Sequence, residues 1–448
     1  MSLTRYNMAI IKNKILLALV IISFALPLGY SFWYKIPPVV DAQAYDRIAI
    51  NIIDGFGFRE DRAKSFEFDT SIVRAGPGYE FFLAGIYSLF GHHYEAVWIL
   101  QALLHALSAL LLFLICQKIF PEKGRVIGLV AAVLFGLHPD LIEISAMLMT
   151  ETLYLFLIIL TVYIFAWVHE KPDNKFISSL LGVVAGASIL TRPPMVLFVP
   201  VVLYAYYRLK NYRSALIFCF GLAFALLPWV LRNYFVYHQL ILTTLIGEYN
   251  VWVGNTLLSN GGQISGGFNP LTTYTEANGF FGLKAKASAE FWSFVFGYPL
   301  IFIKLCLIRF VRYFSLIRPM GFWFYQTGLQ QLIFIVSSAT AIALLFWSGF
   351  TGMAIAFKER RPFFYYLIIL ATTSPLVLIP TVVQSRYRFQ IYPFLAIFGA
   401  YALVAIYNKH SQFKKIPVIV GISLLIISLV DMVSFWETVT ERLHLFIK

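Results

Sequence analysis

The amino-acid sequence predicts an all-helical protein that crosses a membrane many times. Hydrophobic residues make up 60% of the 448 residues and charged residues only 13%, whereas soluble domains contain about 45–50% apolar and about 25% charged residues. Several apolar runs reach the roughly 20 residues that a helix needs to cross a bilayer. These runs are continuous rather than alternating, which is typical of membrane helices and excludes a set of water-soluble domains.

About eleven apolar runs are expected to span the membrane. The first follows several basic residues and is too long for the core of a cleaved signal peptide, so we expect an uncleaved span with a cytoplasmic N-terminus. Basic residues then collect between alternate runs, and the positive-inside rule assigns these segments to the cytoplasmic side of the membrane. The expected spans lie at about 15–33, 96–116, 126–137, 153–168, a run ending at 191, a run ending at 208, 215–231, 333–356, 364–382, 390–407 and 418–430.

The net charge of +13 does not indicate nucleic-acid binding, because the basic residues lie between apolar runs rather than along one stripe. The three cysteines lie far apart inside apolar runs, without the spacing of a disulfide framework or a metal site. His92, His93 and His138 also lack partners at metal-ligand spacing. The sequence therefore predicts no nucleic-acid partner, no metal ion and no cofactor.

Two long segments between spans are expected on the outer face of a single domain, residues 1–448. The first, residues 35–93, contains a short apolar run at 79–90 that we predict to lie at the membrane interface. The second, residues 233–326, ends in a basic apolar stretch that is also predicted to be interfacial, and we expect it to pack against residues 35–75. The first segment concentrates the acids Asp41, Asp46, Asp54, Glu60, Asp61, Glu67 and Asp69.

Two acids are candidates for chemistry at the outer face. Asp41 directly follows the first span, where a carboxylate can accept the proton of a hydroxyl nucleophile, but an aspartate at this position is also a common helix cap. Glu151 lies at the start of the fourth span, where ionisable residues are costly and often functional; the alternative is a helix start capped by Thr150. Asp140 and Glu143 are interpreted as solvated loop charges.

Five arginines are expected on the outer face, where loops normally carry few basic residues. A guanidinium fork suits a phosphate group, so these arginines together could hold an anionic lipid head group. Each could instead pair with a loop acid or with ordinary phospholipid. The last two are the strongest candidates, because the spans on either side of them contain no other charge. The five are Arg74, Arg192, Arg232, Arg386 and Arg388.

The order of these residues along the chain resembles that of the GT-C glycosyltransferases. More narrowly, it is similar to the group that contains protein O-mannosyltransferases, aminoarabinose transferases of lipid A and rhizobial galacturonosyltransferases, and the resemblance covers residues 1 to about 410. The motifs are Asp41…Tyr45, Gly55-Phe-Gly-Phe58, Arg74-Ala-Gly-Pro-Gly-Tyr79, Met149-Thr-Glu-Thr152, Leu190-Thr-Arg-Pro193, Pro228-Trp229 with Arg232-Asn-Tyr234, Gly254-Asn255 and Arg386-Tyr-Arg-Phe-Gln-Ile-Tyr-Pro393.

The resemblance implies a GT-C fold and a defined activity. Members transfer a sugar from a polyprenyl-phosphate carrier to a lipid, glycan or protein acceptor at the outer membrane face, usually with inversion and without a required metal. Asp41 matches the family's catalytic aspartate, which we expect to act as the general base, and Glu151 matches its second acid. The expected contacts of the carrier phosphate are Arg74, Arg192, Arg386, Tyr387 and Arg388. Candidates for substrate binding are Tyr45, Tyr79, Arg232 and Asn255.

Two other functions compete with this interpretation. A transporter, or a flippase of a lipid-linked sugar, would carry ionisable groups near the membrane midplane on broken helices of repeated halves. Here no repeat is visible, and the charges avoid the midplane. An outer-face polysaccharide polymerase or ligase shares the same substrates but is usually organised around a large late loop, without an aspartate in the first loop.

Overall fold

The computed structural model describes residues 3–262, 270–317, 325–408, 415–434 and 436. Within these ranges every regular element is a helix. In chain order they are α1 (Leu3–Tyr34), α2 (Asp41–Ile53), η1 (Thr70–Val73), α3 (Pro77–Phe90), α4 (Tyr94–Ile119), α5 (Gly124–Gly136), α6 (Pro139–Ser145), α7 (Thr150–Glu170), α8 (Lys175–Thr191), η2 (Pro193–Leu197), α9 (Phe198–Arg208), α10 (Tyr212–Tyr237), α11 (Ile246–Gly254), α12 (Pro270–Asn278), α13 (Leu283–Gly297), α14 (Pro299–Phe314), α15 (Gly328–Glu359), α16 (Pro362–Leu378), η3 (Ser385–Ile391), α17 (Tyr392–Tyr407) and α18 (Lys415–Ser434).

Each of the expected spans coincides with a helix, and the predicted fold class is confirmed. Among the described residues, seven segments are long and apolar enough to cross a membrane: α1, α4, α7, α10, α15, η3 with α17, and α18. The number rises to nine if two bent pairs each count as one span, α5 with α6 (59°) and α13 with α14 (104°). Two further expected spans, α8 and α16, are apolar helices of 17 residues, and another, α9, is a helix of 11 residues.

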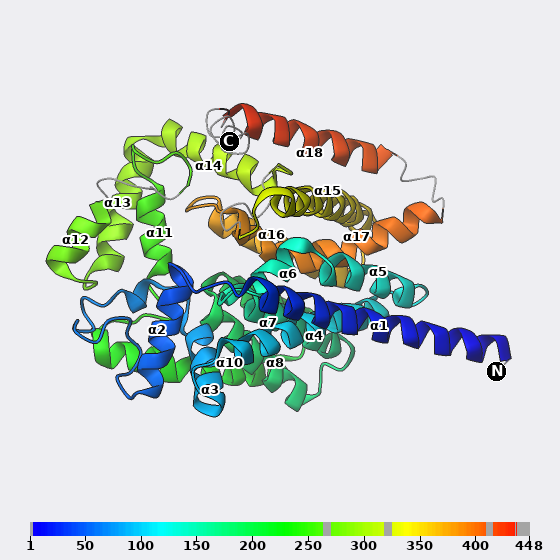
Figure 1. Ribbon diagram of the computed structural model, residues 1–448, viewed down its shortest axis with the longest axis horizontal. Coiled ribbons are helices and arrows are strands. Elements are labelled where there is room, and N and C mark those ends of the chain that lie inside the picture. Colours follow the sequence, from blue (N-terminus) through cyan, green and yellow to red (C-terminus); the bar gives the residue numbers. More distant parts are fainter. Residues whose placement is uncertain (1–2, 263–269, 318–324, 409–414, 435, 437–448) are drawn as a thin grey trace.

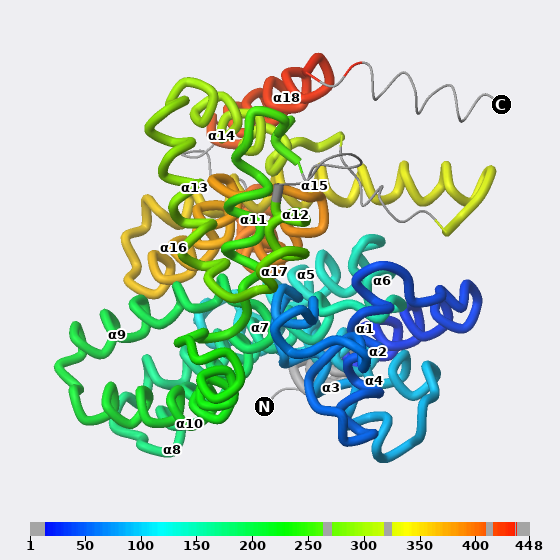
Figure 2. The backbone as a smooth tube through the Cα atoms, turned by 90° about the vertical axis from the view of Figure 1, so that its left-hand side faces the viewer, coloured from blue at the N-terminus to red at the C-terminus, as the bar shows by residue number. Residues whose placement is uncertain are grey.

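The two ends of the helical bundle differ in construction. In Figure 1, α2, α3, α11, α12 and α13 gather at the end opposite to the N-terminal end of α1, which extends away from the bundle. Figure 2 shows α8, α9 and α10 together on one flank, α1 to α4 beside them, and α14 and α18 on the far side. The short helices of the two long segments therefore lie together at one end.

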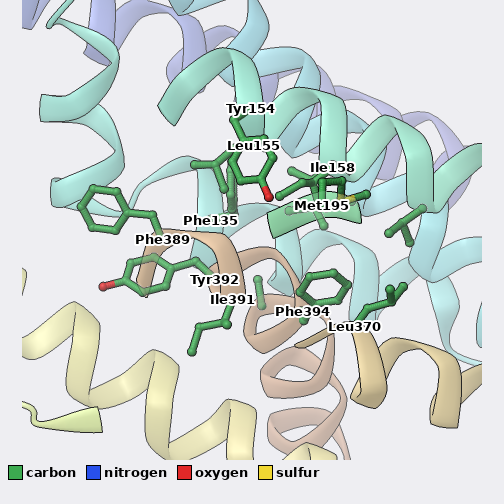
Figure 3. Packing of buried hydrophobic residues seen from close by; sticks show 14 of the residues in the cluster. Phe135, Tyr154, Leu155, Ile158, Met195, Leu370, Phe389, Ile391, Tyr392 and Phe394 are labelled. Atoms are coloured by element: carbon green, nitrogen blue, oxygen red, sulfur yellow. The ribbon is translucent and has the colours of Figure 1, made fainter. Parts of the chain in front are cut away.

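A continuous apolar core fixes the positions of the segments that carry polar side chains. Tyr154 of α7, Met195 of η2, Leu370 of α16 and Phe389 of η3 are all buried in it (Figure 3). Between membrane helices such side chains hold the packed state by close van der Waals contact, because lipid tails are as apolar as the core. The packing holds η2 and η3, which are short irregular turns, against long helices, so that the arginines on or beside these turns have defined positions.

The first and second long segments pack together, as the sequence predicts. The backbone N–H of Leu245 donates to the carbonyl of Ile72 at 2.7 Å, and that of Phe280 donates to the carbonyl of Glu67 at 2.8 Å. A second apolar cluster lies between the segments, with Ile72 and Val73 from the first and residues of α11, α12 and α13 from the second. The two segments form one layer at this end of the bundle.

The expectation that Asp140 and Glu143 are solvated is wrong. Both residues are fully buried on α6, because the chain bends by 59° after α5 and packs α6 against α1 and α15. The hydroxyl of Ser338 donates to Asp140, and the hydroxyl of Tyr30 donates to Glu143 Oε1 at 3.1 Å. A polar partner from another segment thus replaces water at one oxygen of each carboxyl group, while the second oxygen of each is buried without a hydrogen bond among the described residues.

Candidate active site

Two arginines hold the carboxylate of Asp41, the first residue of α2. Its Oδ2 atom lies 2.6 Å from Nη2 of Arg386, and its Oδ1 atom lies 3.4 Å from Nη1 of Arg74. The alternative that Asp41 caps a helix is wrong, because Val40 occupies the cap position and no side chain caps α2. The fold therefore brings an acid that follows α1 together with an arginine of η3, 345 residues later.

A second carboxylate positions Arg74. Its Nη2 and Nε atoms lie 2.6 and 3.1 Å from Oε2 of Glu60. The loop that carries Glu60 is folded around Asp69, whose buried carboxylate accepts the backbone N–H groups of Glu60, Asp61 and Ser71 at 2.8–3.1 Å. Backbone N–H groups are strong donors to a buried carboxylate, so Asp69 fixes the loop and Arg74 projects toward Asp41.

Two glycines allow α3 and α8 to approach closely. A Cβ atom added at Gly76 would lie 2.2 Å from the carbonyl oxygen of Leu190, and one at Gly78 would lie 2.5 Å from Oγ1 of Thr191. Only a residue without a side chain fits at such distances. Arg74 precedes the first glycine and Arg192 follows the end of α8, so this contact brings the two arginines into one site.

Glu151 and Arg192 form a buried ion pair in the same region. Oε1 of Glu151 lies 2.9 Å from Nη2 of Arg192, and the two side chains are 1% and 9% exposed. Thr150 does not cap α7; its hydroxyl instead donates to Oε2 of Glu151 at 3.2 Å. A buried charge is stable only with a partner, so the two residues depend on each other for their positions.

Three tyrosines surround these charged groups. The ring of Tyr387 lies between two arginines, with its centroid 5.7 Å from Cζ of Arg192 and 5.6 Å from Cζ of Arg386. Tyr45 and Tyr79 are buried and meet edge to face at 5.6 Å. Burial, and next the charge of Asp41, raise the pKa of Tyr45 well above its ordinary value. The Tyr45 hydroxyl therefore keeps its proton and can act only as a neutral group.

The arginines determine the protonation state of Asp41. Burial on its own raises the pKa of this carboxyl group, but the charge of Arg386, its hydrogen bond, and the charges of Arg74 and Arg192 together lower the pKa below its ordinary value. Asp41 is therefore a carboxylate near neutral pH. While both arginines contact it, it is a weak base, because proton affinity falls with the pKa.

The site brings equal numbers of opposite charges together in a partly buried region. Three arginines, Arg74, Arg192 and Arg386, face three acids, Asp41, Glu60 and Glu151. An incoming phosphate can replace a carboxylate as the partner of an arginine, because each presents two oxygens that can accept the planar guanidinium fork. The arrangement can thus exchange an internal ion pair for one with an anionic ligand.

Arg388, predicted to contact the carrier phosphate, lies away from Asp41. Its Nη1 atom donates to the carbonyl oxygen of Ser315 at 2.8 Å, and its guanidinium lies 5.7 Å from the ring centre of Phe346 on α15. The side chain is fully buried on the side of η3 that faces α14 and α15. Arg388 therefore does not share the Asp41 site with Arg386, since residues two apart in a 3-10 helix point in different directions, and its contact with the carrier phosphate stays a prediction.

Arg232 and Asn255, expected to contact substrate, both form contacts within the protein, and their substrate contacts stay predictions. Nη2 of Arg232 donates to the carbonyl of Phe58 at 3.1 Å, and four aromatic rings surround the guanidinium, with centroids 5.0–5.7 Å from Cζ. Nδ2 of Asn255 donates to the carbonyl oxygens of Val251 and Pro380, each at 2.9 Å. Both side chains join separate segments of the chain, and neither contacts Asp41.

Two acids near the site, Glu60 and Glu80, are not predicted from the sequence as site residues. Glu60 was one of many acids in the first segment, and nothing in the local sequence marked it as the partner of Arg74. Glu80 lies inside an apolar run; it is fully buried on α3, and burial raises its pKa to about 8 despite the opposing charge of Arg74. The sequence feature that could have identified Glu80 is its position as a lone acid within an apolar helix.

The histidines of the first segment support packing. Nε2 of His92 lies 2.9 Å from Oδ1 of Asp46, which also accepts the Tyr87 hydroxyl at 2.6 Å. These contacts tie α2 to α3. Over the residues that the structure describes, no group of three or more His, Cys, Asp or Glu side chains has the arrangement to hold a metal ion.

The helical bundle, with its layer of short helices at one end, has the GT-C fold, and the resemblance noted in the sequence is confirmed at this level. Residues 74–231, about a third of the chain, match the family model described as dolichyl-phosphate-mannose-protein mannosyltransferase. No curated protein matches the sequence.

Solved structures from an archaeon and a bacterium share the fold. The apo oligosaccharyltransferase of Archaeoglobus fulgidus has 14% identity and a TM-score of 0.57, over 95% of this chain and 55% of that one. The same organism's AglB, in complex with an inhibitory peptide and a dolichol-phosphate, has 13% identity and a TM-score of 0.54, over 95% and 54%. ArnT from Cupriavidus metallidurans, bound to undecaprenyl phosphate, has 13% identity and a TM-score of 0.51, over 96% and 72%. The chain thus spans about half the length of the archaeal enzymes.

Proposed function

We propose that this chain is a membrane glycosyltransferase that takes a sugar from a polyprenyl-phosphate carrier and transfers it at the outer face of the membrane. The observation that carries the proposal is the meeting of Arg74, Arg192 and Arg386 around the carboxylate of Asp41. Transfer from a glycosyl phosphate requires fixed cations for the leaving phosphate and a base for the acceptor hydroxyl. This site contains both kinds of group side by side.

Donor binding would activate Asp41. When the carrier phosphate contacts Arg386 and Arg74, these arginines exchange Asp41 for the phosphate, and the carboxylate loses the contacts that lower its pKa. Burial, which raises the pKa, then dominates, and Asp41 becomes a stronger base. The exchange couples the arrival of the donor to the readiness of the base, so that an empty site has little capacity to activate a hydroxyl or water.

In the proposed chemical step, Asp41 is the base. The acceptor oxygen attacks the anomeric carbon as the bond from that carbon to the phosphate oxygen breaks, and the acceptor proton passes to Asp41. The polyprenyl phosphate leaves with an additional negative charge, which the arginines stabilise. Attack from the face opposite to the phosphate inverts the anomeric centre. Glu151 holds Arg192 in position for this step through their 2.9 Å ion pair.

The comparisons support the lipid-linked donor. The matching structures include one bound to undecaprenyl phosphate and one in complex with a dolichol-phosphate, and the family model is named for a dolichyl-phosphate sugar donor. We infer a polyprenyl-phosphate donor for this chain from these relatives together with the arginine cluster. The acceptor is a lipid, glycan or protein, and the membrane is the bacterial inner membrane.

The direct test is turnover of a defined donor. The purified full chain in lipid nanodiscs is mixed with undecaprenyl-phosphate mannose, aminoarabinose or galacturonic acid, and phosphorus NMR follows the conversion of the phosphodiester to the monoester. We expect conversion of at least one donor. If none of the three donors is converted and vesicles that contain the chain take up a free solute, the result would instead favour a transporter.

Arg386→Ala tests the phosphate contact. Loss of one fixed cation at developing charge lowers turnover by about 10²–10³-fold. Arg47→Ala is the matched control, because Arg47 is an exposed arginine on α2 at the same end of the bundle. Equal loss in both variants would show that overall charge, and not the site, is responsible.

Cysteine labelling tests the outer-face assignment. Ser65 is exposed in the first segment and Glu122 is exposed between α4 and α5. A membrane-impermeant maleimide should modify Ser65→Cys in intact cells and reach Glu122→Cys only after the membrane is opened. The reverse pattern would contradict the orientation.

A further inference from the structure

A pocket of about 560 Å³ lies within the layer of short helices, outside the Asp41 site. Its walls come from α11, α12 and α13, which lie together in Figures 1 and 2. Pockets of roughly 300–1,000 Å³ that are mostly apolar, with a few polar groups, are typical small-molecule sites. Neither the arginine cluster nor the proposed chemistry uses this pocket.

The walls of the pocket combine aromatic rings with uncharged polar groups. Trp252 and Tyr274 meet edge to face at 5.6 Å and form one side. Asn278 and Ser293 supply an amide and a hydroxyl at the opening, where both are exposed. Thr256 contributes a hydroxyl whose oxygen is buried and, among the described residues, has no hydrogen-bond partner. A ligand with its own hydroxyl groups would satisfy this oxygen.

The charges at the pocket are already neutralised. Nζ of Lys286 lies 2.6 Å from Oε1 of Glu290 one turn later on α13, and 5.9 Å from the ring centre of Trp252. The pocket therefore has no excess cation for a phosphate or a carboxylate. Aromatic faces next to amide and hydroxyl groups fit a neutral, hydroxyl-rich ring, whose C–H faces pack on aromatic carbon while its edges form hydrogen bonds.

The pocket is attached to the two segments that supply the arginines of the site. Before α11, the backbone N–H of Leu245 donates to the carbonyl of Ile72, two residues before Arg74. At the end of α11, Asn255 donates to the carbonyl of Pro380, six residues before Arg386. A ligand held in the pocket thus lies on the same layer as the site and on elements bonded to both arginine-bearing segments.

We propose that this pocket binds the carbohydrate portion of the acceptor, a neutral oligosaccharide, and so selects a glycan or glycolipid over a polypeptide. The proposal rests on the proposed glycosyltransferase function and assigns its acceptor class. It predicts that blocking the pocket removes acceptor binding and leaves donor hydrolysis unchanged, because the arginine cluster is a separate structure.

The test measures saccharide binding by saturation-transfer NMR on the full chain in nanodiscs, without donor. The probes are neutral di- and trisaccharides of hexose and N-acetylhexosamine, with a hexapeptide and glycerol phosphate as comparison ligands. Ser293→Trp fills the pocket from α13, and Thr273→Trp fills it from α12. The matched control is Ser288→Trp, an exposed serine of α13 that lies away from the lining residues Lys286, Glu290 and Ser293 on the helix.

We expect ring-proton signals from at least one saccharide in the wild-type chain and in Ser288→Trp, and a loss of about tenfold or more in both blocking variants. Donor hydrolysis should be equal in all four proteins. Saccharide signals that are absent from the wild type, or that persist in both blocking variants, overturn the proposal, as does blockable binding of only the peptide or glycerol phosphate. If donor hydrolysis fails while blockable saccharide binding remains, the proposed glycosyltransferase function falls; the pocket is then a saccharide site, and its assignment to an acceptor falls with that function.

Discussion

Asp41→Asn is the substitution that separates chemistry from donor binding. The side chain keeps its shape, but the amide cannot accept a proton from an acceptor hydroxyl at neutral pH. It also carries no charge, so the 2.6 Å contact with Arg386 loses its ionic character. In the proposed mechanism the carrier phosphate displaces this contact in the wild-type chain, whereas in the variant it competes with a weaker partner of Arg386.

The two effects have opposite signs and different sizes. General-base catalysis contributes about 10²–10⁴-fold to turnover, so turnover should fall by at least about 100-fold. A hydrogen bond to a charged group contributes about 1.5–3 kcal/mol, against about 1 kcal/mol for a neutral one. Weakening the Asp41–Arg386 contact by about 1.4 kcal/mol would tighten carrier binding about tenfold.

The assay measures both quantities on the same preparation. Turnover is followed by phosphorus NMR, and the Kd for undecaprenyl phosphate is measured by titration in nanodiscs, with folding checked by the melting temperature. Near-normal turnover of Asp41→Asn would refute the assignment of Asp41 as the base. A carrier Kd that stays the same or weakens would refute the exchange of partners at Arg386.

Three further outcomes are expected. Gly76→Ala should lower the melting temperature, because its Cβ would lie 2.2 Å from a carbonyl oxygen of α8; Gly85→Ala on α3, with nothing within 4 Å, should not. Glu151→Gln leaves Arg192 buried without its counter-ion and should lower the free energy of unfolding by about 3–5 kcal/mol. A calorimetric unfolding transition equal to that of the wild type would mean that the pair contributes no stability. Burial raises the pKa of Glu80 from its ordinary value of 4.5 to about 8. Between these two pH values the folded state keeps the Glu80 proton and the unfolded state releases it. The free energy of unfolding therefore falls as the pH rises from about 4.5 to 8. Glu80→Gln should reduce this fall, and melting curves with the same pH dependence in both proteins would contradict the assignment.

The sequence predicted most of the secondary structure but only part of the packing. Continuous apolar runs identified the long helices, because a bilayer imposes length and composition on any span. The sequence does not reveal the burial of α6, whose Asp140 it predicts to be a solvated loop charge. The bend before α6 buries this residue without leaving any mark on the local composition. The sequence also does not predict that Glu60 pairs with Arg74, because 14 residues and a folded loop separate them.

The sequence by itself determined that the chain is a bundle of membrane helices with an aspartate after the first span and arginines at the ends of later ones. Only the tertiary structure decided which arginines meet Asp41. Arg386 and Arg388 have the same chemistry and lie two residues apart, yet the first contacts Asp41 and the second contacts Ser315. A 3-10 helix turns by about 120° per residue, so the packing of η3 between the neighbouring helices determines which of the two side chains faces the site.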